Sequence, residues 1–340
     1  MSQMEPAEGG IPISVWEEKL ASVHKGPDAH RRPEEGWNAV MAHLAYMGEA
    51  IRRTNYRELL DAAAHTFAWM CSYVTQCNHT TYTEFLFRAG LSEIVGLKYP
   101  GVCGHCISSR CECEPVRVNA VADKSARYRE LLNRGKHIQW EAYSVAYWLQ
   151  CFWNIYAGRI HLQPMETIGF HLLEEAGEEA RAVRQLVEFR GVLSHDIEGI
   201  SQSFLELLSG APGLIQEYEK SANEMKELKK KPSGEDAFAA IRNNESDPRV
   251  IRARLVRAKM RFVTEIADTF SWFCSVLLKA RKTFADSEIL KEYSGFDLLE
   301  AKLREVYGYP ELTCYQCGET TCACIFFPEG PTPATAETPV

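Results

Sequence analysis

One spacing of four cysteines occurs twice in this chain of 340 residues. The segment GVCGHCISSRCEC follows the pattern C-x2-C-x4-C-x-C, and LTCYQCGETTCAC repeats that pattern nearer the C-terminus. A Tyr-Pro pair precedes each segment, at Tyr99-Pro100 and at Tyr309-Pro310. Self-similarity of this kind indicates an internal duplication in which each repeat ends in a cysteine cluster.

Segments upstream of the clusters support the duplication. TFAWMCS, which begins at Thr66, aligns with TFSWFCS, which begins at Thr269, at an offset of 203 residues. HLAYMGEA aligns loosely with HLLEEAGEEA, with Glu49 opposite Glu178, at an offset of 129. The offsets differ by 74 residues, which predicts an insertion of that length in the second repeat, at about 191–257. We therefore expect a degenerate repeat at 11–115, an enlarged repeat at 124–327, and a disordered Pro- and Thr-rich tail at 328–340.

The composition is that of a chain with a large hydrophobic core, because 46% of the residues are hydrophobic and 25% are charged. A net charge of -8 argues against a general nucleic-acid surface or an anionic membrane surface. The most apolar stretch, 143–155, contains Gln150 and Asn154 and is too short to span a bilayer. Because no N-terminal signal is visible either, we expect a cytoplasmic protein without a membrane partner.

Apolar residues recur at helical spacing along most of the chain, which predicts an all-α bundle. Two of the expected helices have dense apolar stripes. One spans about 165–185, and the other begins at Pro248, after Asp247, and runs to about Arg281. Their stripes predict that both helices face the core. The stripe residues are Ile168, Leu172, Ala176, Ala180, Val183 and Val187 in the first, and Phe262, Ile266, Phe270, Phe273 and Leu277 in the second.

Acidic residues accompany both stripes. Glu174, Glu175 and Glu178 form E-E-x-x-E in the first helix, and Glu265 and Asp268 form E-x-x-D in the second. Residues three apart share one helical face, so each helix presents two carboxylates side by side. Four carboxylates that converge need a cation. Any one acid on a helix is more often solvated, and that is what we expect for Glu179 and Glu188.

Together the two acidic motifs resemble the signature of the MazG-like, all-α nucleoside triphosphate pyrophosphatases. The resemblance covers mainly 165–190 and 258–282, with weaker cover over 37–77. It implies a helical bundle of two MazG-like repeats that pair as a covalent pseudo-dimer. It also implies Mg²⁺ or Mn²⁺ bound by Glu175, Glu178, Glu265 and Asp268, with Glu174 orienting a ligand or a water molecule. The reaction implied is hydrolysis of a ribo- or deoxyribonucleoside triphosphate to the monophosphate and pyrophosphate.

The first repeat lacks this acid set. Ala45, Tyr46, Ala62 and His65 stand opposite Glu174, Glu175, Glu265 and Asp268, and only Glu49 is retained. The second repeat departs from the family in another way, because 86 residues separate Glu178 from Glu265 where the family has a short connection. In the first repeat only 12 residues separate the corresponding positions, Glu49 and Ala62. The long gap in the second repeat therefore indicates an insertion between two helices that are otherwise joined by a short connection.

Phosphoryl transfer requires positive charge near the phosphates. The candidates to bind substrate phosphates are the basic residues that follow the acids in sequence, Lys279, Arg281, Lys282, Lys302 and Arg304. The alternative for each is a solvated surface charge. Trp272 lies one turn after Asp268 and is either a base-stacking residue or a core residue.

The eight clustered cysteines indicate structural zinc, because four thiolates in C-x2-C-type spacing suit a closed tetrahedral site. They are Cys103, Cys106, Cys111 and Cys113 in the first cluster and Cys314, Cys317, Cys322 and Cys324 in the second. Disulfides and iron-sulfur centres are the alternatives. Cys71, Cys77, Cys151 and Cys274 read as buried thiols.

Two functions remain open from the sequence. The first is a metal-dependent nucleoside triphosphate pyrophosphohydrolase, with the nucleotide as its partner. The second is a non-catalytic, zinc-stabilised interaction or nucleotide-sensing protein whose acids serve only for binding. The oligomeric state is open as well, with a homo-oligomer as one option.

Overall fold

A computed structural model describes residues 10–28, 31–79, 88–113, 137–193, 248–284, 295–322 and 324, with short stretches within 130–135 and 216–224. These residues form helices, and the one β pairing among them is an isolated bridge between Pro12 and Ser144. The predicted all-α class is confirmed for this part of the chain. The helices are α1 (Ile13–Asp28), α2 (Pro33–Arg52), α3 (Tyr56–His79), α4 (Leu91–Lys98), the 3-10 helix η1 (Trp140–Ala142), α6 (Val145–Leu162), α7 (Met165–Leu193), α11 (Pro248–Thr283) and α12 (Leu298–Tyr307).

Local signals set several helix ends. The Ser144 hydroxyl accepts a hydrogen bond from the backbone N–H of Tyr147 at 3.2 Å and so caps α6. Pro33 stands at the start of α2, where its missing N–H costs nothing. Gly308 ends α12 at a φ of 70°, a left-handed conformation that favours glycine.

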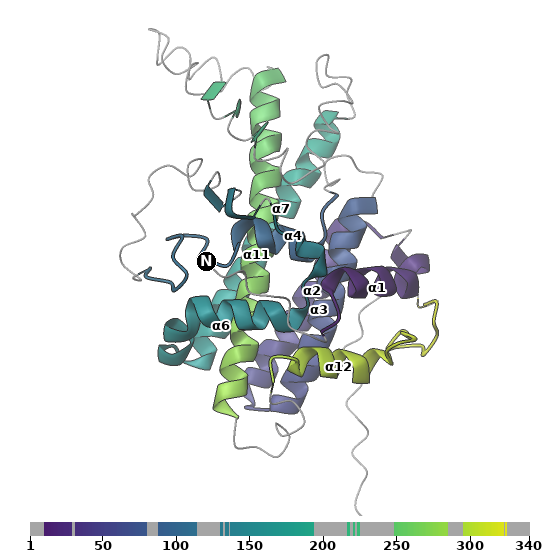
Figure 1. Cartoon of the computed structure of the whole chain (residues 1–340). Coiled ribbons are helices and arrows are strands. Elements are labelled where there is room, and N and C mark those ends of the chain that lie inside the picture. The colour runs from purple at the N-terminus through teal and green to yellow at the C-terminus, as the bar shows by residue number, and fades with distance from the viewer. Residues whose placement is uncertain are drawn as a thin grey trace, which may run out of the picture.

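Two helix pairs form the centre of the bundle, α2 with α3 and α7 with α11. The outer helices are arranged in the same way on both pairs: α1 and α12 pack on α3, whereas α6 and α4 pack on α11. The two pairs meet through α2 and α7, where the indole N–H of Trp37 donates to the carbonyl of Ala176 at 3.1 Å. Figure 1 shows α11 running through the molecule, with α6 crossing it.

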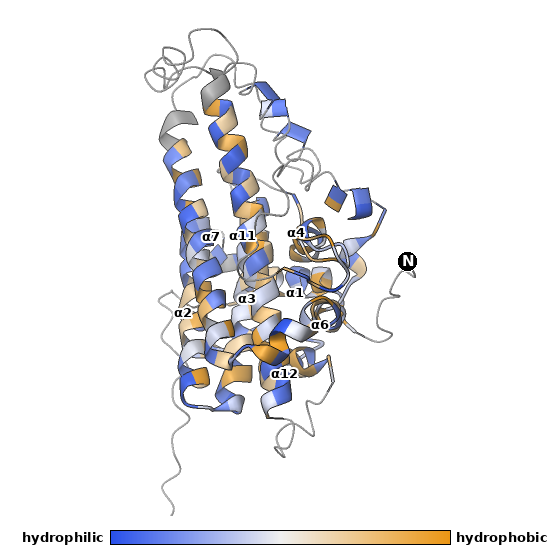
Figure 2. Ribbon diagram, turned by 90° about the vertical axis from the view of Figure 1, so that its left-hand side faces the viewer, coloured by the Kyte–Doolittle hydropathy of each residue, from blue (hydrophilic) through white to orange (hydrophobic). Residues whose placement is uncertain are grey.

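The apolar stripes of the two acidic helices form much of the core. All five stripe residues of α11 are buried, and so are Ile168, Leu172, Ala176 and Val183 of α7. The prediction that both helices face the core is therefore confirmed, and α11 begins at Pro248 as expected. Beyond the core, α7 and α11 extend together past the other helices (Figure 2).

The cysteine loops follow α4 and α12, and each lies against a helix of the other half. The backbone N–H of Cys111 donates to the carbonyl of Ile155 in α6 at 2.8 Å. In the same way, the N–H of Cys322 donates to the carbonyl of Val23 in α1 at 2.7 Å. The chain thus carries the first loop to the acid-bearing half.

Other sequence predictions fall largely outside the described residues. The predicted tail at 328–340 is one of them. The predicted insertion is another, although its two ends belong to α7, which reaches Leu193, and to α11. Among the described helices, none combines the length and apolar character that crossing a membrane requires.

Candidate metal centre and its surroundings

α7 and α11 run antiparallel (Figure 1) and bring their acidic motifs together. Glu175, Glu178 and Glu265 each place a carboxylate oxygen within 4.8 Å of the others. Burial, and next the negative charge of Asp268, raise the pKa of Glu175 to about 8. Burial also raises the pKa of Glu265. Carboxylates that are crowded and partly dehydrated in this way hold their charge poorly until a cation joins them.

These three glutamates fit a hard divalent cation. Their donors are all carboxylate oxygens, which Mg²⁺ and Mn²⁺ prefer, and they come from two rigid helices. Arg261 approaches the same acids, at 3.7 Å from Glu178 and 3.6 Å from Glu265. At these distances the guanidinium offsets part of the negative charge without a close hydrogen bond.

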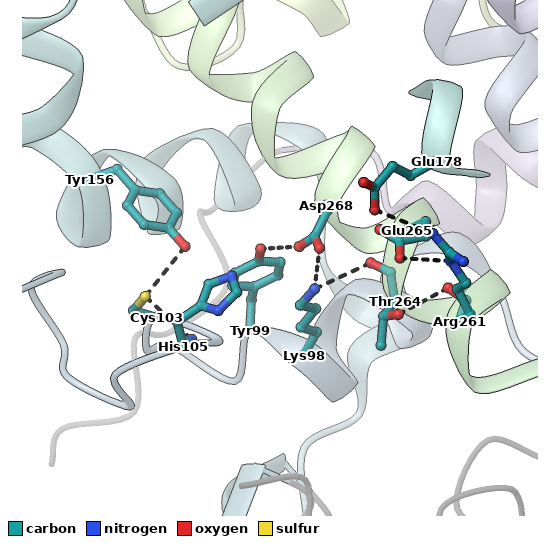
Figure 3. A network of polar contacts seen from close by, with 10 residues as sticks. All are labelled: Lys98, Tyr99, Cys103, His105, Tyr156, Glu178, Arg261, Thr264, Glu265 and Asp268. Carbon is teal, nitrogen blue, oxygen red and sulfur yellow. Dashed lines mark hydrogen bonds and ion pairs between the residues drawn. The ribbon is translucent and has the colours of Figure 1, made fainter. Parts of the chain in front are cut away.

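Asp268, the fourth predicted ligand, is placed differently. Its carboxylate forms an ion pair with Lys98 and accepts a hydrogen bond from the Tyr99 hydroxyl, as Figure 3 shows. All three side chains are buried. A carboxylate has about four lone-pair sites, so these two contacts leave Asp268 able to accept a further partner. Lys98 and Tyr99 were absent from the predicted site, and the Tyr-Pro pair before each cysteine cluster was the available signal.

Glu179 is where a sequence expectation was wrong. We expected a solvated acid, but the side chain is fully buried and accepts a hydrogen bond from the Tyr73 hydroxyl at 2.9 Å. Burial raises its pKa well above the ordinary range, which favours a protonated carboxyl beside the cluster. Glu179 is buried because α2 packs on α7 and Tyr73 reaches it from α3, in addition to the packing of α7 on α11. Glu188, by contrast, is exposed as expected.

The predicted phosphate-binding residues lie away from the acids and have other contacts. Lys279 donates to the carbonyl of Ile160 at 3.1 Å, and Lys282 contacts His161. Residue 279 follows Glu265 by 14 positions, or about 21 Å along α11 at 1.5 Å per residue. The remaining three contact neighbours on other surfaces: Arg281 with Phe296, Lys302 with Asp61 and Glu305, and Arg304 with Glu300 and Tyr309.

Trp272 lies at the edge of the acidic site. Its ring stacks on the ring of His171 with centroids 4.6 Å apart, and His171 contacts the exposed Glu174 at 3.2 Å. The guanidinium of Arg159 lies 5.7 Å from the centre of the Trp272 ring. Trp272 is half-buried, so it is neither a core residue nor a fully open platform.

Arg159 also lines a pocket of about 530 Å³ between α6 and the first cysteine loop. The loop contributes residues 109–111 and the helix contributes residues 153–159. Arg110 adds a second positive charge to this lining. The pocket therefore joins the first cysteine loop to the edge of the acidic site through Arg159.

Both cysteine clusters have geometry that suits a bound metal ion. In each cluster all four Sγ atoms lie within 4.8 Å of one another, and all eight cysteines are free thiols. Sulfur atoms at the corners of a zinc tetrahedron with bonds of about 2.3 Å are about 3.8 Å apart. The spacings of 3.6 Å for Cys103–Cys111 and 4.0 Å for Cys314–Cys324 fit that value. Each cluster could thus bind structural zinc.

In the first half, rings occupy the place that corresponds to the acidic site. His65, which aligns with Asp268, contacts the Tyr307 hydroxyl at 3.1 Å and packs on Tyr315. His43 packs on His65, and neither of its ring nitrogens has a hydrogen-bond partner among the described residues. Glu49 is half-buried and pairs with Arg52 and Arg53. No described group of acids that could hold a metal ion lies in this half.

In His43→Leu, the free energy of unfolding should fall less at acid pH than it does in the wild type. Burial lowers the pKa of His43 to about 3, so the folded state resists a proton that the unfolded chain accepts below its ordinary pKa of 6.5. Stability that is present above pH 6.5 is then lost as the pH falls. Between about pH 7.5 and pH 5 the wild type should lose about 2 kcal/mol more than the variant. Urea unfolding at both pH values measures this, and an equal loss in both proteins would contradict it. His79→Leu, at the exposed end of α3, is the control.

A comparison of the chain with protein-family models, with curated proteins and with solved structures finds no match.

Proposed function

We propose that this protein is a divalent-metal-dependent nucleoside triphosphate pyrophosphohydrolase built from two MazG-like repeats, of which the second keeps the metal site. The observation that carries the proposal is the meeting of Glu175, Glu178 and Glu265 from two helices, with their oxygens within 4.8 Å of one another. E-x-x-E and E-x-x-D motifs that meet across one helix pair are the arrangement that the resemblance implies.

The repeated packing supports the two-repeat architecture. α1, α2, α3 and α12 correspond in their contacts to α6, α7, α11 and α4. The two cysteine loops also share a backbone conformation, since Ile107 and Gly318 both have positive φ, at 61° and 73°. The rings that fill the first half agree with its role as a degenerate copy.

In the proposed reaction, water attacks the α-phosphorus, the bond to the oxygen that bridges the α and β phosphates breaks, and pyrophosphate leaves. A cation held by Glu175, Glu178 and Glu265, with Asp268 beside them, would neutralise phosphate charge and lower the pKa of the attacking water. Arg261 holds two of these acids from one side. Trp272 is the aromatic residue that a base would contact at the edge of the site, beside His171 and Arg159.

The test is product analysis with a panel of ribo- and deoxyribonucleoside triphosphates in Mg²⁺ or Mn²⁺. Pyrophosphate and monophosphate should appear in equal amounts, and EDTA should stop their formation. Orthophosphate and diphosphate as products would point to a different bond cleavage. No product from any nucleotide, with the metal content confirmed, would refute the proposed activity.

A nucleotide-sensing protein is the second candidate. It is favoured by the contacts of Asp268, whose carboxylate is held by Lys98 and Tyr99 instead of joining the three glutamates. On this view the site binds a metal-nucleotide complex without turnover. Tight nucleotide binding in the absence of any product would distinguish the sensor from the enzyme.

A further inference from the structure

A nucleotide bound at the acidic site would need a positively charged side chain beside its phosphates. The basic residues after Asp268 lie away from the acids and do not supply that charge. Lys98 is a buried lysine that contacts one of the acids directly. Its ammonium group pairs with Asp268 and lies 3.5 Å from the carbonyl oxygen of Thr264. Burial raises the pKa values of Glu175 and Glu265, and the positive charge of Lys98 offsets part of that rise. Its charge therefore acts on three acids of the site.

The first cysteine loop fixes this lysine in place. Lys98 is the last residue of α4, and Cys103 follows five positions later. Gly104 packs directly on the lysine, because a Cβ atom there would lie 3.0 Å from Lys98 Cγ and 3.1 Å from its carbonyl oxygen. The Tyr156 hydroxyl donates to Cys103 Sγ at 3.6 Å, and its ring packs on Tyr99 (Figure 3). Cys103, the lysine and Asp268 are all buried and thus form one connected unit.

The two halves of the chain differ at the residue that precedes the Tyr-Pro pair. Lys98 precedes the first Tyr-Pro pair, whereas Gly308 precedes the second. Gly308 is left-handed, a conformation that disfavours lysine. Tyr315 of the second loop packs on His65, the residue that aligns with Asp268. The half that lacks the acids therefore supplies the lysine, and the half that has the acids receives it.

We propose that Lys98 is the phosphate-binding cation of the acidic site, delivered across the molecule by the first cysteine loop, so that the site is composite and neither half is sufficient alone. This inference rests on the proposed function. When a divalent cation takes up the charge of the acids, the attraction of Asp268 for Lys98 falls, and the ammonium group is left to contact phosphate oxygens. Asp268 and Tyr99 act as positioning residues for the lysine.

The experiment measures binding of tripolyphosphate, and of the α,β-methylene analogue of any nucleotide that the protein hydrolyses, by calorimetry with Mn²⁺. Lys98→Met should weaken both at least about tenfold, while Lys98→Arg should retain most of the affinity. The affinity for Mn²⁺ in the absence of a phosphate should not fall in Lys98→Met, because the variant lacks a positive charge that repels the metal ion. Lys19→Met, which alters a lysine that contacts the second loop at the carbonyl of Pro310, is the control.

Each result decides between the two proposals. If the wild type releases pyrophosphate and Lys98→Met binds the probes as tightly as the wild type, the role of Lys98 is overturned and the proposed function stands. If no nucleotide is hydrolysed but tripolyphosphate binding depends on Lys98, the phosphate site stands and the enzymatic proposal fails. If Lys98→Met loses Mn²⁺ affinity together with probe affinity, the lysine supports the acids instead, and the inference is overturned. If the wild type binds neither tripolyphosphate nor the analogue and releases no pyrophosphate, both proposals fail.

Discussion

Glu265→Gln should lower the rate of pyrophosphate release by about a thousandfold, which corresponds to about 4 kcal/mol of transition-state stabilisation. Glu265 belongs to the three-carboxylate group, and an amide has one weak oxygen donor where the carboxylate has two charged ones. The free energy of unfolding should not fall with the activity. Burial raises the pKa of Glu265, so the folded protein gains by losing an acid that is costly to ionise.

Loss of activity without loss of stability separates a role in metal binding from a structural one. The measurements are initial rates at saturating Mg²⁺ and urea unfolding of both proteins. Glu49→Gln is the matched control, because Glu49 aligns with Glu178 and is half-buried like it, but pairs with arginines in the half without a described acid group. It should keep wild-type activity. A Glu265→Gln variant that retains more than about a tenth of the wild-type rate would contradict the assignment.

Cys106→Ser and Cys317→Ser should have equal effects on metal content and unequal effects on activity. Each removes one thiolate from a four-thiolate cluster, so bound zinc should fall from two ions per chain to one, and stability should fall by about 3 kcal/mol or more. Only the first cluster lies in the loop that packs on Lys98, at the end of α4, and on Tyr99. Pyrophosphate release should therefore fall about tenfold or more in Cys106→Ser alone.

Metal analysis, urea unfolding and rates at a temperature where both variants are folded provide the three readouts. Cys71→Ala is the control, because this buried thiol lies on α3 outside either cluster. It should keep both zinc ions. Equal loss of activity in the two serine variants would show that the clusters act only through global stability, and full zinc content in either variant would exclude the four-thiolate sites.

The acidic motifs were predictable because their information is local. Residues three apart on a helix share a face whatever the rest of the chain does, so E-x-x-E and E-x-x-D each specify a carboxylate pair. The apolar stripes then specified which faces of α7 and α11 meet. The cysteine clusters were predictable for the same reason, since four ligands within eleven residues close on themselves.

The contact between Lys98 and Asp268 was not predictable in this way. Lysines and arginines near the acids in sequence were the natural choice, but Lys279 and Lys282 lie several turns along α11 and contact α6. Lys98 is 170 residues from Asp268 in sequence, and only the packing of α4 on α11 brings them together. A lysine carries no periodic pattern that identifies its distant partner.

The burial of Glu179 also depends on tertiary packing and not on the local sequence. The spacing places it next to Glu178 on α7, and an acid there is solvated on a helix that packs on one side only. In the structure α2 packs on α7, and the Tyr73 hydroxyl of α3 donates to the carboxyl. Its burial depends on how the two helix pairs meet.

The sequence by itself determined the helices, their apolar faces, the acid pairs and the two four-cysteine loops, because each depends on residues a few positions apart. The tertiary structure alone decided that the first loop reaches the acids of the second half, that Lys98 and Tyr99 hold Asp268, and that rings fill the corresponding place in the first half. Those contacts join residues on different elements, and their geometry follows from how whole helices pack.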